Sequence, residues 1–137
     1  MTDRLKQILH TGRHSLVVAH GADIRTFDGK GVSDLLTLLD KNEELLKEAL
    51  VADKIVGKAA AGLMACGGVK EVYADIICTP AIALLRKQGI AVSYGEELDH
   101  IENRTHDGWC PLEMACKNLA SGEDIKSAIL QIVNRKK

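Results

Sequence analysis

The most constraining feature of this chain is a run of three segments between residues 69 and 95. The apolar stretch "VKEVYADIIC" is followed by "TPAIALLRKQG" and then by "IAVSYG". Pro80 suits the first turn of a helix and Gly89 the position after its end, so the middle segment is predicted to be a helix between two strands. A strand, helix and strand in this order indicate a right-handed parallel crossover, which is typical of α/β proteins.

The segments around this unit add helices and a hairpin. Residues 2–9 have apolar side chains at helical spacing. Two strand-like runs in residues 15–31 meet at Gly21, which indicates an antiparallel hairpin. Residues 32–50 predict a helix capped by Ser33 or Asp34, with a break near Asn42. Residues 121–133 predict a closing amphipathic helix with Ser121 as its N-cap.

Residues 52–68, "ADKIVGKAAAGLMACGG", predict one further helix, with Asp53 at its N-cap and Gly67 and Gly68 as its stop. Small side chains dominate it, so a neighbouring backbone or a ligand can approach closely. Four larger residues are expected to share one face of this helix: Val56, Ala60, Leu63 and Met64.

These elements predict a single α/β domain over residues 1–137, with a mixed sheet sandwiched between helices. The chain has 18 basic and 19 acidic residues, so its net charge of −1 gives no broad field that would attract nucleic acid. It contains no apolar run of about 18 residues and no signal-peptide pattern, so we expect no membrane span and a cytoplasmic location with reduced thiols.

Phosphate-loop and metal motifs are not matched. Gly57-Lys58 is followed by Ala59 where a phosphate loop needs Ser or Thr. Cys110 and Cys116 are six residues apart, which on a helix rotates one from the other by about 240° and raises it by about 9 Å. No histidine pair is suitably spaced either, so we expect no metal and no cofactor.

The segment "CPLE" predicts the start of a helix. Cys110 is at the N-cap and Pro111 at the first position, and Glu113 is placed to reach back to the N-cap N–H. A thiol at the positive end of a helix can also be a reactive nucleophile, although Glu113 opposes the necessary fall in its pKa. Cap and reactive thiol both remain open.

Several of these stretches together resemble a known family: "DKIVGKAAA", "VYADIIC" followed by "TPAIALL", "IENR" and "CPLE". They are similar to the family called domain of unknown function 1893, whose fold resembles cytidine deaminase. The likeness runs from Leu16 to Glu113. It implies a three-layer α/β/α sandwich, with a pocket where the helices beginning near Asp53 and Thr79 point their N-termini.

The sequence departs from working deaminases at the metal ligands. Residues 58–61, "KAAA", stand where the resemblance implies His-x-Glu, and residues 80–84, "PAIAL", stand where it implies Pro-Cys-x-x-Cys. Hydrolytic deamination depends on a metal-activated water, so the resemblance excludes a zinc deaminase. The two helix N-termini would still attract an anion such as a phosphate. The polar residues expected to line the pocket are Asp53, Lys58, Asn103, Arg104, Cys110 and Glu113.

Three functions remain open. The first is a metal-free binding or regulatory protein for a nucleoside- or nucleotide-related small molecule. The second is a thiol enzyme with Cys110 as nucleophile, assisted by Glu113 or His106. The third is a structural role in a homo-oligomer. In the simplest alternative to a pocket, Asp53 and Glu113 only cap helices and Arg104 pairs with one of them.

Overall fold

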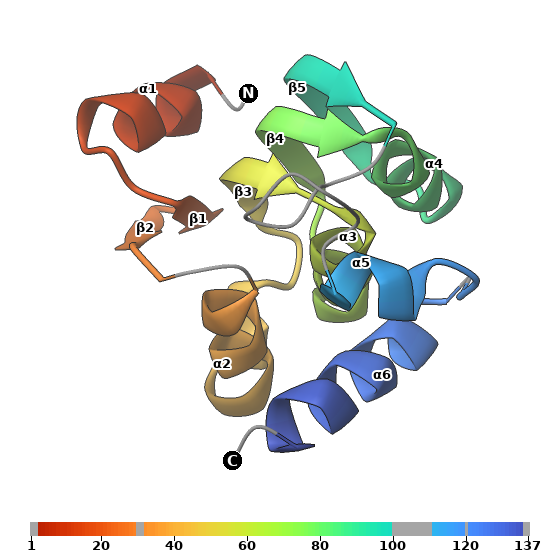
Figure 1. Cartoon of the computed structure of the whole chain (residues 1–137). Coiled ribbons are helices and arrows are strands. Elements are labelled where there is room, and N and C mark those ends of the chain that lie inside the picture. Colours follow the sequence, from red (N-terminus) through yellow and green to blue (C-terminus); the bar gives the residue numbers. More distant parts are fainter. Residues whose placement is uncertain (1–2, 30–31, 100–110, 120, 136–137) are drawn as a thin grey trace.

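A five-stranded mixed sheet forms the centre of the protein, in a computed structural model that describes residues 3–29, 32–99, 111–119 and 121–135 (Figure 1). The strand order is β2-β1-β3-β4-β5. Strands β1, β2 and β3 pair antiparallel through β1, whereas β3, β4 and β5 are parallel. The strands are β1 (Leu16–His20), β2 (Asp23–Phe27), β3 (Leu50–Val56), β4 (Glu71–Cys78) and β5 (Ala91–Leu98). The predicted α/β class with a mixed sheet is confirmed.

Six α-helices and one short 3-10 helix connect and follow the strands in the described ranges. They are α1 (Asp3–Thr11), α2 (Ser33–Lys41), η1 (Glu43–Leu45), α3 (Lys58–Gly67), α4 (Thr79–Lys87), α5 (Pro111–Cys116) and α6 (Gly122–Arg135). None of the helices in this part of the chain is long and apolar enough to cross a membrane. The cytoplasmic location stays a prediction.

The ends of two helices test the predicted caps. Ser121 caps α6 as expected, because its Oγ accepts the N–H of Asp124 at 3.1 Å. The predicted side-chain cap of α2 is wrong, since Val32 is at the N-cap position. Asp34 instead accepts the N–H of Gly29 at 2.8 Å, which joins the first turn of α2 to the residue two positions after the end of β2.

Strand β3 corrects the prediction of one helix over residues 52–68. Only the part from Lys58 onward is helical, and Asp53 lies within a strand and not at an N-cap. In the sheet Asp53 lies opposite Leu16 of β1 and beside Ala74 of β4. A central strand buried on both faces carries a nearly continuous apolar run, which periodicity alone does not distinguish from a buried helix. Val56 is the last residue of this strand and therefore does not belong to the helix face that was predicted to include it.

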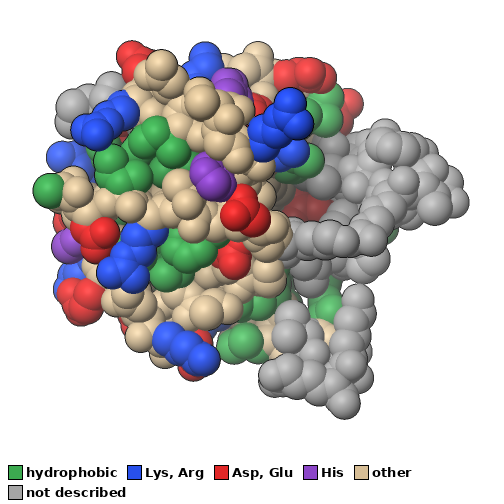
Figure 2. Space-filling model, turned by 90° about the vertical axis from the view of Figure 1, so that its left-hand side faces the viewer, with side chains coloured by type: hydrophobic (Ala, Val, Ile, Leu, Met, Phe, Trp, Pro, Cys, Tyr) green, Lys and Arg blue, Asp and Glu red, His purple; other side chains and the backbone are tan. Residues whose placement is uncertain are grey.

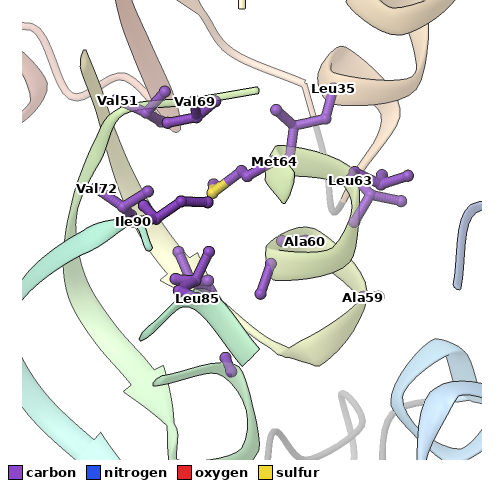
Figure 3. Packing of buried hydrophobic residues seen from close by; sticks show 14 of the residues in the cluster. Leu35, Val51, Ala59, Ala60, Leu63, Met64, Val69, Val72, Leu85 and Ile90 are labelled. Carbon is purple, nitrogen blue, oxygen red and sulfur yellow. The ribbon is translucent and has the colours of Figure 1, made fainter. Parts of the chain in front are cut away.

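Helices cover both faces of the sheet. On one face Leu5 and Leu9 of α1 pack with Val17, Ala52 and Tyr73. On the other face a larger core joins the sheet to α2, α3, α4 and α6. In Figure 3, Met64 extends from α3 toward Val72 and Ile90. This distribution follows from the strand alternation, because successive side chains of β1 and β3 enter opposite cores.

Charged side chains of both signs are interspersed on the face seen in Figure 2, which is the side that carries α1 and the β1–β2 hairpin. This mixture agrees with the near-zero net charge of the sequence. No large patch of one charge sign is visible on that face.

Helix α3 is the most buried helix and approaches α6 closely, as its small side chains predicted. Its residues from Ala59 to Met64 are all buried. A Cβ atom added at Gly62 would lie 2.5 Å from Cγ2 of Ile125. A Cβ added at Gly122 would lie 2.8 Å from the carbonyl oxygen of Gly62. Glycine at these two positions therefore permits the crossing of α3 and α6.

A Gly62→Ala substitution is expected to destabilise the protein by about 1–3 kcal/mol, because the new methyl group overpacks the contact with Ile125. Alanine normally favours a helix interior by about 1 kcal/mol over glycine, so a net loss would identify packing as the cause. Urea denaturation measures the difference. In an Ile125→Ala background the same substitution should cost less, and equal costs in both backgrounds would contradict the explanation.

Candidate functional site

The carboxyl ends of β3 and β4 bring the N-termini of α3 and α4 to one edge of the sheet. The two strands are parallel neighbours, with Val56 paired to Ile77. Gly57 is the N-cap of α3, and Cys78 is the N-cap of α4. The N–H groups of Lys58 and Ala81, one from each helix, both act on the Cys78 thiol. The two helix starts therefore meet at this thiol, although the N-cap of the first, Gly57, lies four residues later than the predicted Asp53.

Glu113 of α5 occupies the start of α3. Its side chain is buried, at 5% exposure, and one oxygen, Oε1, accepts the N–H of Lys58 at 2.5 Å. The other oxygen, Oε2, accepts the N–H of Ala59 at 3.0 Å. A carboxylate at this position satisfies two donors that have no partner within the helix and interacts favourably with the helix dipole. Glu113 therefore caps a helix that lies more than fifty residues away in the chain.

Lys58 makes a second contact with the α5 segment, through its side chain. Its ammonium Nζ donates to the carbonyl oxygen of Lys117 at 3.0 Å, just beyond the end of α5. Because its backbone N–H binds Glu113, Lys58 contacts both the first turn of α5 and the residue after its last turn. The structure thus brings together two of the predicted site residues, Lys58 and Glu113, and joins them to each other.

The Cys78 thiol lies against the Glu113 carboxylate, with 3.9 Å between Sγ and Oε1. Burial raises the pKa of the Cys78 thiol, and the charge of Glu113 raises it further, whereas the N–H of Ala81 lowers it. Burial also raises the pKa of the Glu113 carboxyl, against the lowering effect of the N–H groups that it accepts. The thiol is therefore protonated at neutral pH and can donate to the carboxylate.

Cys78 was not among the residues predicted to line the pocket. The side chain is buried, at 1% exposure, but it is also part of the polar contact with Glu113. A signal was present in the sequence, because Cys78 ends a buried strand and immediately precedes a helix with Pro80 in its first turn. Residues at the carboxyl ends of parallel strands are the usual places for binding groups in α/β proteins.

Asp53 is the second buried acidic side chain of the described residues, at 9% exposure. Burial raises its pKa to about 8, and nearby Asp34 and Asp75 add to the increase. The backbone N–H groups of Ile55 and Lys54 act in the opposite direction. At neutral pH Asp53 is therefore mainly an uncharged carboxylic acid within β3, and not the charged helix cap that the sequence predicted.

Two further polar pairs flank this region of the sheet and were missed. His14 Nδ1 lies 2.8 Å from Asp28 Oδ1, where β1 begins and β2 ends. The Thr79 hydroxyl at the start of α4 donates to Glu97 Oε2 at 2.7 Å. Each pair joins separate strands or a helix and a strand, so linear spacing carries no signal for it.

The remaining predicted site residues, Asn103, Arg104, His106 and Cys110, lie outside the described residues. Their proposed roles as pocket lining, thiol nucleophile or helix cap stay predictions. Within the described ranges, no group of three or more His, Cys, Asp and Glu side chains is arranged to hold a metal ion.

Gly57 is required by the Glu113 contact. A Cβ atom at this position would overlap the Glu113 carboxylate, whereas the Gly57 φ of −92° is open to any residue. A Gly57→Ala variant is therefore expected to lose about 1–3 kcal/mol of unfolding free energy through displacement of Glu113. Denaturation in a Glu113→Ala background provides the comparison. The penalty should largely vanish there, and a full penalty would mean that the backbone is the cause.

Since Glu113 already occupies the N–H groups of Lys58 and Ala59, an external phosphate could bind them only by displacing this carboxylate. The carboxylates of Glu113 and of Glu97, which binds Thr79, also disfavour an anion at this edge. The arrangement is better suited to a ligand that donates hydrogen bonds or is uncharged.

Comparisons with known proteins give a family and solved structures of similar fold. A family model described as TM1506, domain of unknown function (DUF1893), matches residues 4–133. The crystal structure of a DUF1893 family protein, TM1506 from Thermotoga maritima, superposes with a TM-score of 0.85. The two sequences are 26% identical, and the match covers 93% of this chain and 86% of the other. No curated protein matched the sequence.

Proposed function

Because the chain belongs to the DUF1893 family, whose description assigns no activity, we propose its function from the polar edge of its sheet. The protein is a metal-free binding protein with a cytidine-deaminase-like α/β/α sandwich. Its ligand is a nucleoside-related small molecule, bound at the carboxyl ends of β3 and β4. Thr79 contacts this ligand, while Glu113, Lys58 and Cys78 form the support beneath it.

The deaminase-like fold is supported by the order of the elements. Zinc deaminases carry His-x-Glu on one helix and Pro-Cys-x-x-Cys on a second helix. The starts of the two helices must lie close together, because the zinc ligands and the Glu that transfers the proton act at one site. Two units of this chain have the order helix, strand, helix: α2-β3-α3 and α3-β4-α4. Neither motif occurs at the start of α2, α3 or α4. The fold can therefore retain the position of the pocket without the ligands that zinc chemistry requires.

The observation that carries the proposal is the docking of Glu113 on the N–H groups of Lys58 and Ala59. It supplies a rigid, buried polar group beneath the edge where ligands of α/β sheets bind. It also neutralises the positive end of α3, which removes the main attraction for a phosphate. For this reason we propose that the base and sugar make the contacts, and that a 5′-phosphate adds no affinity.

Thermal shift and calorimetry with adenosine, cytidine, guanosine, uridine and their 5′-monophosphates test the proposal. A nucleoside present at 100 times its Kd should stabilise the fold by about 2.7 kcal/mol. The monophosphate should bind no more tightly, and inorganic phosphate alone should have no effect. Absence of stabilisation by every compound would refute nucleoside binding, and stabilisation by inorganic phosphate would refute the neutralised helix end.

A Thr79→Val variant locates the site. Loss of one hydroxyl hydrogen bond should weaken nucleoside binding by about 1 kcal/mol, or roughly fivefold. Thr26→Val removes an exposed threonine from β2, away from α4, and serves as the matched control. Equal affinities of the two variants would place the ligand elsewhere.

A further inference from the structure

We draw no further inference here: the strongest candidate, the cavity of about 300 Å³ between the C-terminal ends of α3 and α4, carries nothing that would select a ligand, because the two charged residues in its lining, Glu48 and Lys70, are exposed and neither buried acidic side chain of the described residues lines it.

Discussion

A Glu113→Ala variant is expected to lose about 3–5 kcal/mol of unfolding free energy. The substitution leaves the part-buried N–H of Lys58 and the buried N–H of Ala59 without their acceptor, and a buried donor left unpaired costs about 1–3 kcal/mol. It also removes one of the contacts that hold α5 against α3, and leaves the one from Lys58 Nζ to the carbonyl oxygen of Lys117. Urea denaturation measures the loss, and faster hydrogen exchange at the amides of Lys58 and Ala59 identifies its location.

Glu113→Gln separates charge from shape. The amide has nearly the same volume, but its NH2 group must face one of the two N–H donors, so a loss of about 2 kcal/mol is expected. Glu44→Gln, at an exposed position of η1, is the matched control and should stay within about 0.5 kcal/mol of the parent. If Glu113→Ala were as stable as this control, the carboxylate would not be stabilising α3.

Asp53→Asn is expected to make the protein more resistant to alkaline pH. The pKa of Asp53 in the folded protein is about 8, against an ordinary value of 3.8 for an aspartate side chain, so the folded state holds the proton more tightly than the unfolded state. Stability of the parent protein therefore falls as pH rises from about 4 through about 8. The full shift corresponds to an upper limit on the order of 6 kcal/mol. Asparagine is neutral throughout and avoids this loss.

Denaturation at pH 5, 7 and 9 checks this expectation. The advantage of Asp53→Asn should grow with pH, while its amide oxygen still accepts the N–H groups of Ile55 and Lys54. A smaller pH dependence of the same sign should remain from Glu113, whose carboxyl pKa burial also raises. Asp40→Asn, at an exposed position of α2, should run parallel to the parent protein. A parallel profile for Asp53→Asn would show that Asp53 is ionised in the folded state.

Much of the α/β architecture could be predicted from local patterns. The strand, helix and strand over residues 69–95 became β4, α4 and β5, with Pro80 and Gly89 at the expected ends of the helix. The hairpin turn has Gly21 at φ 61°, a conformation that glycine adopts without strain. Gly68 ends α3 in the left-handed conformation. These features depend on the backbone preferences of single residues, so neighbouring sequence is sufficient to reveal them.

The sequence by itself therefore determined both ends of α4, the C-terminal end of α3, the hairpin, the parallel crossover and the small-residue surface of α3. Tertiary structure decided that Leu50–Val56 is a strand, because its neighbours β1 and β4 supply the hydrogen bonds that a helix would have made internally. It also decided the partner of Glu113, because the N–H groups of α3 attract any carboxylate that the fold brings near. Burial and hydrogen-bond partners depend on residues distant in the chain, and local sequence patterns contain no measure of that proximity.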